Sequence, residues 1–102
     1  MRFALFTALL LLFLYTATAQ AGSPYAGKIK AETVCSQCHG MVLPSEGAPF
    51  PPLAGRDADY LKSALKQYRD KRRRSEMMNN IAGSLSDQDI DNVALYYSRL
   101  KP

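Results

Sequence analysis

Two cysteines and one histidine stand together in the first half of this 102-residue chain, in the order Cys-Ser-Gln-Cys-His. Cys35 and Cys38 are the only cysteines, and His39 is the only histidine. This run matches the attachment signature of c-type haem. Two thiols on one helical turn can each add across a different vinyl group of one porphyrin, and the next residue then holds its imidazole within reach of the iron. The motif therefore predicts one haem c bonded covalently to Cys35 and Cys38, with His39 as an iron ligand.

Three other interpretations of the cysteine pair compete with haem attachment. A redox-active dithiol of the thioredoxin kind expects a βαβ context, which the surrounding pattern lacks. A closed zinc site needs four ligands, and His39 is the only histidine that could add to the two thiols. A plain disulfide is the third interpretation, and it suits an exported protein. Haem attachment is favoured over all three, because c-type haem is attached outside the cytoplasm and this chain begins with an export signal.

Residues 1–21 have the three-part layout of a secretory signal peptide. Arg2 gives a positive start, residues 3–15 are almost wholly apolar, and small-x-small patterns end at Ala19 and Ala21. An uncleaved membrane anchor is the alternative, but the apolar stretch reaches only roughly 20 Å as a helix against a hydrocarbon core of about 30 Å. We expect cleavage after Ala19 or Ala21, a bacterial periplasmic location, and no stable membrane insertion afterwards.

The remaining residues 22–102 are enough for one small domain, and such a domain usually needs a disulfide, a metal or a cofactor for stability. Residues 40–55 hold four prolines and three glycines, so this stretch cannot be helical throughout. An irregular segment of this length is unusual in a small domain unless it wraps around something. Both observations favour a large apolar ligand at the centre of the fold.

Helices must position the motif. The first is expected over residues 25–36, with Pro24 suited to a helix start. The second follows Asp57 as N-cap and runs to about residue 70. Its apolar residues recur at helical spacing; they are Leu61, Leu65 and Tyr68.

The third helix has the clearest start signal, because Ser86 as N-cap and Asp89 three residues later form a relative of the capping box. It is expected over residues 87–100, where apolar residues again recur at helical spacing. No stretch alternates with the period of a strand, so the sequence predicts an all-α fold.

The order of motifs resembles the class I cytochromes c, in particular the short bacterial cytochromes c553 and the halves of cytochrome c4. After CSQCHG come PPLAGR, YLKSAL, LSDQDI and ALYYSRL, and the resemblance covers essentially residues 22–102. It implies the small class I cytochrome c fold, with helices wrapped around one covalently bound haem. It also implies that Gly27 lets the terminal helices touch, with Tyr96 as its partner.

The resemblance further implies two residues of the haem site. Pro51 would offer its backbone carbonyl to the Nδ1–H of His39, so that Nε2 faces the iron. Leu53 would pack against the porphyrin. The alternative is that Pro51 only makes the loop rigid, and this alternative is stronger for Pro52.

The methionines are the candidates for the sixth ligand of the iron, and a vacant or different sixth site is the alternative. Met41 follows the motif too closely to reach the opposite face of the haem. Met77 and Met78 lie much further along the chain, so the segment between them and His39 is long enough to wrap around the ring. Chain length alone therefore allows either methionine to be the ligand. The resemblance selects Met78, which stands seven residues before Leu85. The other methionine of the pair would then fill space in the core.

Histidine and methionine together favour reduced iron relative to two histidines. With both axial positions filled, one-electron transfer is favoured over catalysis, which describes a carrier rather than an enzyme. We expect a monomeric periplasmic shuttle that accepts electrons from a dehydrogenase or quinol-oxidising complex and donates to a terminal oxidase or reductase. The alternatives are a dedicated subunit of one redox enzyme, and a haem-based sensor or gas binder with a labile methionine ligand.

The net charge of +4 is concentrated in Arg69 and residues 71–74. A basic protein can bind nucleic acid, anionic lipid or an acidic protein surface, and export disfavours nucleic acid. Residues 71–74 are therefore a candidate docking patch for an acidic redox partner. They could instead pair with haem propionates, as could Arg56, or form an ordinary solvated loop.

Overall fold

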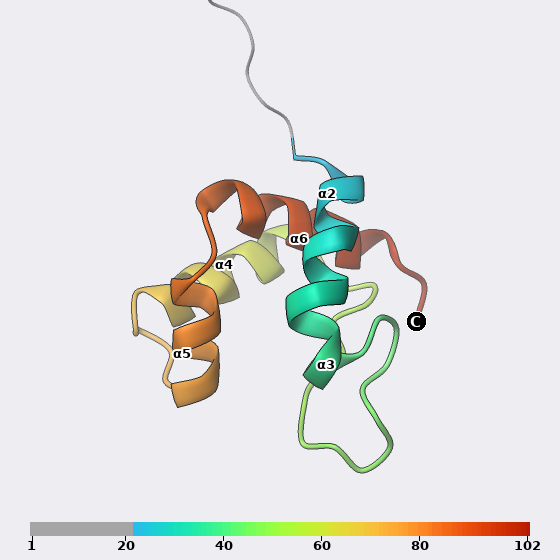
Figure 1. Ribbon diagram of the computed structural model, residues 1–102, viewed down its shortest axis with the longest axis horizontal. Coiled ribbons are helices and arrows are strands. Elements are labelled where there is room, and N and C mark those ends of the chain that lie inside the picture. The colour runs from blue at the N-terminus through green and yellow to red at the C-terminus, as the bar shows by residue number, and fades with distance from the viewer. Residues whose placement is uncertain (1–21) are drawn as a thin grey trace, which may run out of the picture.

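The computed structural model describes residues 22–102. The predicted signal peptide lies outside the described residues and stays a prediction. In chain order the helical elements are α2 (Pro24–Lys30), η1 (Ala31–Cys35), α3 (Ser36–His39), α4 (Ala58–Arg69), α5 (Glu76–Gly83) and α6 (Asp87–Arg99). Figure 1 labels the five α-helices. No strand occurs over residues 22–102, so the all-α prediction is confirmed for this part of the chain.

The elements α2, η1 and α3 form one continuous helical run that ends at the Cys-Ser-Gln-Cys-His motif (Figure 1). Ser23 caps its start, since the Ser23 Oγ accepts a hydrogen bond from the Ala26 N–H at 3.2 Å. The run ends at Gly40, whose φ of 69° favours glycine. The predicted end at residue 36 was wrong by three residues, because the motif itself supplies the last turn. Within the run, η1 is a π-helical turn, which shifts the face on which the following side chains lie.

Helices α2 and α6 cross in direct backbone contact at Gly27. A Cβ atom on Gly27 would collide with the backbone carbonyl of Asn92 and lie 2.9 Å from the Cβ of Tyr96. The Asn92 side chain, buried at the same crossing, accepts a hydrogen bond from the Ser23 N–H at 2.7 Å. The predicted contact between Gly27 and Tyr96 is therefore confirmed, and it brings the first and last helices together.

Both predicted N-caps of the later helices are confirmed. The Asp57 Oδ2 accepts the Tyr60 N–H at 3.0 Å at the start of α4. At the start of α6, the Ser86 Oγ accepts the Asp89 N–H and the Asp89 Oδ2 accepts the Ser86 N–H, both at 3.0 Å. These local bonds satisfy backbone donors that a helix leaves free at its start.

The buried core between η1, α4 and α6 is small. Its main cluster consists of Ala31, Leu61, Val93, Ala94 and Tyr97, two of them alanines. Short chains bury little apolar surface in any case. The helices therefore depend on further apolar contact beyond their own side chains.

Helix α5 was not predicted, and the expectation of three helices was wrong. Its start is capped by Ser75, whose Oγ accepts the Met78 N–H at 3.3 Å. The helix has eight residues, which is too short to be stable alone in water. It forms because it packs against the end of α4, a tertiary effect with no periodic signal in the sequence.

Residues 40–57 contain no helix or strand, as their prolines predicted. The loop is tied back to the last helix by the Gly55 N–H, which donates to the Tyr97 carbonyl at 2.9 Å. In Figure 1 it is the long irregular segment after α3.

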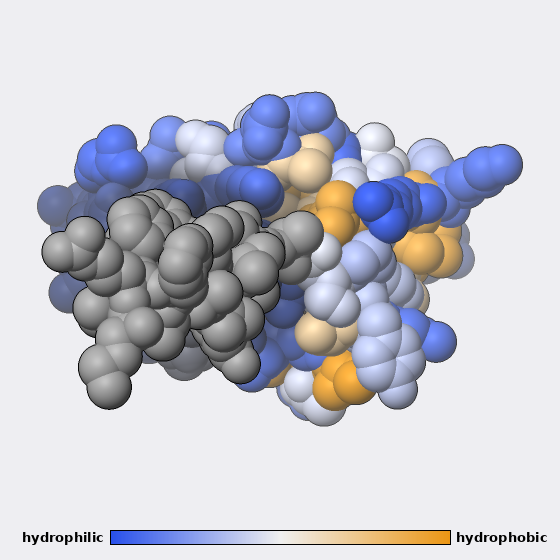
Figure 2. Space-filling view, turned by 90° about the horizontal axis from the view of Figure 1, so that it is seen from above, coloured by the Kyte–Doolittle hydropathy of each residue, from blue (hydrophilic) through white to orange (hydrophobic). Residues whose placement is uncertain are grey.

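The outer surface is mixed in character. On the ungreyed part of the face in Figure 2, hydrophobic residues form separate areas among hydrophilic ones. Across residues 22–102, no helix has the length and apolar character needed to cross a bilayer.

Candidate functional site

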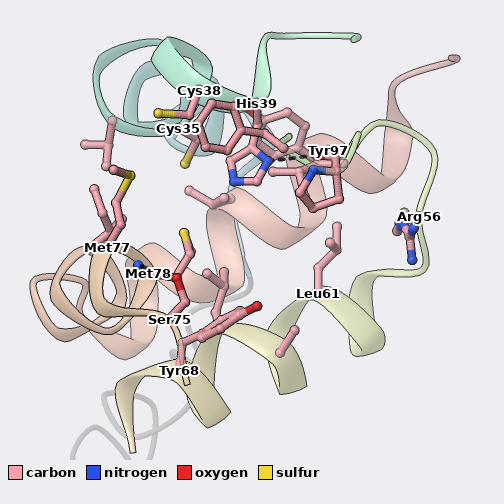
Figure 3. Close-up of a pocket in the computed structure, with 18 of the residues that line it drawn as sticks. Cys35, Cys38, His39, Arg56, Leu61, Tyr68, Ser75, Met77, Met78 and Tyr97 are labelled. Carbon is pink, nitrogen blue, oxygen red and sulfur yellow. Dashed lines mark hydrogen bonds between the residues drawn. The ribbon is translucent and has the colours of Figure 1, made fainter. Parts of the chain in front are cut away.

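A cavity of about 410 Å³ opens between the motif, the proline-rich loop and helices α4, α5 and α6 (Figure 3). This volume lies within the range of about 300–1,000 Å³ found for small-molecule and cofactor sites. Every residue that the sequence assigned to the site lines this one cavity. They are Cys35, Cys38, His39, Pro51, Leu53 and Met78, together with Met77.

The two thiols of the motif are free and partly buried. Burial raises the pKa of the Cys35 thiol to about 11, although nearby Lys30 opposes this rise. The raised pKa disfavours a reactive thiolate at Cys35. Zinc also lacks a ligand set, since residues 22–102 contain no group of three or more His, Cys, Asp or Glu side chains suited to a metal.

The imidazole of His39 is fixed from behind by the proline-rich loop. Its Nδ1 lies 2.7 Å from the backbone carbonyl oxygen of Pro51, so Nδ1–H donates and Nε2 keeps a free lone pair. The predicted hydrogen bond is confirmed. Phe50 packs beside the imidazole at a centroid distance of 6.0 Å. In Figure 3 the His39 ring lies at the cavity wall, beside the two cysteines.

The three methionines of residues 22–102 differ in where their side chains lie relative to the cavity. Met78 is partly buried and its side chain extends into the cavity on the side facing His39, as Figure 3 shows. Met77 is 55% exposed and lies at the cavity edge. Met41 does not line the cavity but packs against the core cluster. The geometry thus favours Met78 as the thioether opposite the imidazole.

Tyr97 is a site residue that sequence reasoning missed. The spacing of α6 predicted only a core position, and its side chain is 1% exposed. However, its hydroxyl donates a hydrogen bond to the Gly40 carbonyl at 3.0 Å, directly after His39. Burial raises the pKa of this phenol, so it stays a donor. No sequence pattern links residues 40 and 97, because the contact depends on how α6 crosses the motif.

Two arginines line the cavity, where they stack against tyrosine rings. The Arg56 guanidinium carbon lies 5.3 Å from the centroid of the Tyr60 ring. The Arg73 guanidinium carbon lies 5.9 Å from Tyr60 and 5.5 Å from Tyr68. Neither arginine takes part in an ion pair within the part of the chain that the structure describes. The cavity therefore has two cationic groups that could meet an anionic ligand.

The structure divides the basic segment that the sequence treated as one patch. Arg69 pairs with Asp87 at 2.7 Å, and Arg72 pairs with Asp70 at 3.0 Å. Arg73 faces the cavity, whereas Lys71 and Arg74 are exposed. Only the last two remain as unpaired surface cations among residues 71–74, so the candidate docking patch is smaller than expected.

Comparison with known proteins gives consistent matches. The family model described as "Cytochrome C oxidase, cbb3-type, subunit III" matches residues 23–96. Cytochrome c-554(548) of Halomonas halodenitrificans is 41% identical over 81 residues, which cover 76% of this chain and 96% of that protein. Cytochrome c4 of Thiocapsa roseopersicina is 38% identical over 82 residues, which cover 80% of this chain and 42% of that protein.

A solved structure of cytochrome c4 from Acidithiobacillus ferrooxidans shares the fold, with a TM-score of 0.64 and 29% identity. The match covers 83% of this chain and 53% of that one. The chain therefore spans nearly all of one relative and about half the length of the cytochromes c4.

Proposed function

The chain belongs to the cytochrome c family described as cytochrome c oxidase, cbb3-type, subunit III, and we propose that it is a periplasmic mono-haem electron shuttle. Its fold is that of a class I c-type cytochrome, its cofactor is haem c, and its function is electron transfer. The iron of bound haem c takes up and releases single electrons at a potential that its axial ligands tune.

Four of the residues that line the cavity would hold the haem in this proposal. Cys35 and Cys38 would hold the haem through thioether bonds, and His39 would bind the iron through Nε2. Met78 would be the second side-chain ligand of the iron. The observation that carries this assignment is that one cavity has the motif on one wall and the Met78 side chain extending from another.

Two residues of the loop support this ligand set. The Pro51 carbonyl, 2.7 Å from the His39 Nδ1, fixes the tautomer and the ring orientation that present Nε2 to the iron. Leu53 lines the same cavity and supplies an apolar contact for the porphyrin.

The proposed ligand set favours a carrier over an enzyme. The Met78 thioether and the His39 imidazole would both be bound to the iron, which would leave no iron position for a substrate. A methionine ligand would raise the reduction potential of the bound haem relative to a second histidine. A sensor would need Met78 to leave readily, and its capped position in α5 works against that.

Arg56 and Arg73 are proposed to neutralise the carboxylates of the haem. Both line the cavity, and tyrosine rings hold their guanidinium groups without a competing carboxylate among residues 22–102. Pairing a carboxylate with a guanidinium reduces the cost of placing its charge near an apolar site.

The location and partners belong to the same proposal. Residues 1–21 direct export to the periplasm, and residues 22–102 act there as a monomer without stable membrane insertion. Redox proteins with acidic surfaces donate and accept the electron, steered by Lys71 and Arg74. A dedicated subunit of one redox enzyme is the second candidate, favoured by the family description as an oxidase subunit.

A visible spectrum with a redox titration tests the proposal. We expect haem that resists acid–acetone extraction, a single one-electron transition, and the red absorbance band of methionine-ligated ferric haem. Carbon monoxide should not displace the ligand. Extractable haem, or rapid carbon monoxide binding, would contradict the shuttle, whereas stable co-purification with one redox enzyme would favour the second candidate.

A further inference from the structure

The side-chain amide of Asn79 bonds to three separate backbone groups. Its Nδ2 donates to the Tyr68 carbonyl at 2.7 Å and to the Arg73 carbonyl at 2.8 Å. Its Oδ1 accepts the Ser75 N–H at 3.1 Å. A carboxamide offers two N–H donors and one carbonyl oxygen, so both donors and the acceptor are in use.

These three bonds join three parts of the chain. Tyr68 lies in the last turn of α4, Arg73 lies in the connecting loop, and Ser75 caps the start of α5. The loop between the helices turns sharply, with Lys71 at a φ of 63°. Asn79 thus fixes both the loop and the following helix against α4.

Met78 sits inside this arrangement. Ser75 accepts the Met78 N–H through its Oγ and donates its own N–H to Asn79, the residue that follows Met78. An eight-residue helix has little stability of its own, so outside contacts must set its position. The bonds of Asn79 to the Tyr68 and Arg73 carbonyls are such contacts.

We propose that Asn79 is a positioning residue that holds Met78 at the cavity and so maintains the axial bond. This inference rests on the proposed function, in which Met78 is the sixth ligand. Without Asn79, the start of α5 would lose its hydrogen bond to α4, and an outside ligand would compete more easily with the thioether.

Asn80 provides a matched control on the same helix. It is exposed, and its side chain forms no hydrogen bond with any group in the structurally described part of the chain. Replacing Asn80 therefore changes helix propensity by the same chemistry as replacing Asn79, without removing the three bonds.

The experiment uses the haem-loaded protein and the variants Asn79→Ala, Asn79→Asp, Asn80→Ala and Met78→Ala. Imidazole is titrated into the oxidised protein to measure its affinity for the haem iron. In a second measurement, the protein is heated while the red band and the far-UV circular dichroism are recorded. Asn79→Ala should bind imidazole about tenfold more tightly than the natural protein, which corresponds to about 1.4 kcal/mol. Its red band should fade below the temperature at which helicity is lost. Asn80→Ala should stay within about twofold of the natural protein.

Asn79→Asp keeps the acceptor for the Ser75 N–H but loses both donors and faces two carbonyls with a charge. It should match or exceed the effect of Asn79→Ala, and it serves if the alanine variant does not fold. The inference is overturned if both Asn79 variants bind imidazole like Asn80→Ala. Met78→Ala tests the ligand assignment separately from the role of Asn79. If this variant keeps the red band, Met78 is not the ligand, and the inference about Asn79 falls with the assignment. If the band is lost, the assignment stands and the Asn79 variants alone decide the inference.

Discussion

At the residue scale, the end of the motif is held by a hydrogen bond from the other end of the chain. The Tyr97 hydroxyl donates to the Gly40 carbonyl at 3.0 Å, and Tyr97 is almost fully buried. The bond fixes the turn through which the chain leaves His39. We therefore expect it to contribute to the stability of the fold.

Replacing Tyr97 by Phe should remove this bond while keeping the ring. We expect a loss of about 1 kcal/mol in the free energy of unfolding, because a carbonyl then lacks its donor. Guanidinium unfolding of the haem-loaded protein measures it, with Tyr96→Phe as control. Equal stability of the two variants would show that the bond to Gly40 contributes nothing.

At the element scale, the crossing of α2 and α6 depends on one missing side chain. Gly27→Ala would drive a Cβ into the Asn92 carbonyl, so the helices must separate. A loss of about 2 kcal/mol or more is expected, as for other overpacked sites. Thermal unfolding measures it. Gly83→Ala is the control, since Gly83 ends α5 with open space around it and should be neutral or slightly stabilising.

A second prediction at this scale concerns the ion pair between α4 and α6. The Arg69 guanidinium, through its hydrogen bond and its charge, lowers the pKa of Asp87. A carboxylate with a lowered folded pKa adds stability above its unfolded pKa of about 3.9 and loses it as the pH falls through the lower folded value. Urea unfolding of Asp87→Asn should therefore show a weaker loss of stability below about pH 4 than the natural protein.

Asp59→Asn serves as the control for that experiment. Asp59 also lies in the first turn of a helix, but it forms no ion pair within residues 22–102. If both variants change the acid limb equally, the effect comes from the helix ends and not from the Arg69 pair. High salt should reduce the difference between the natural protein and Asp87→Asn.

The elements differ in how far the sequence could predict them. The starts of α4 and α6 were predictable because Asp57, Ser86 and Asp89 act on backbone groups only three residues away. Helix α5 was not, because Asn79 ties it to groups up to eleven residues away. Ser75 followed by Glu76 was its one local signal.

The site shows the same division. The cysteines and His39 were predictable because their chemistry is encoded in adjacent residues, and the resemblance supplied the contact of Pro51 with His39. Arg73 was grouped with surface cations because its neighbours are surface cations. Its place in the cavity wall follows from the turn of the loop, which no local pattern specifies.

At the scale of the whole molecule, the surface charge should influence encounters. Lys71 and Arg74 are exposed and lie on the loop beside α5. Changing both to Gln should slow oxidation of the reduced protein by the ferricyanide anion about two- to fivefold at low salt, because steering weakens. Stopped-flow absorbance at several salt concentrations measures it, with Lys101→Gln as a one-charge control. An unchanged salt dependence would remove these residues from the docking surface.

The whole fold should also depend on the haem. The main core cluster has only five residues, and beside it lies a cavity of about 410 Å³ lined by residues of α4, α5, α6 and the proline-rich loop. Without haem, those apolar walls would face water, and a domain of this size has little other stabilisation.

The variant Cys35→Ala with Cys38→Ala should therefore lose most of its helicity, as far-UV circular dichroism would show. The single variant Cys35→Ala keeps one thioether and should keep most of its helicity, which separates loss of haem from loss of a thiol. A haem-free double variant that unfolds cooperatively would contradict the prediction. It would mean that α2, α4 and α6 hold together by the Gly27 crossing and the small core alone.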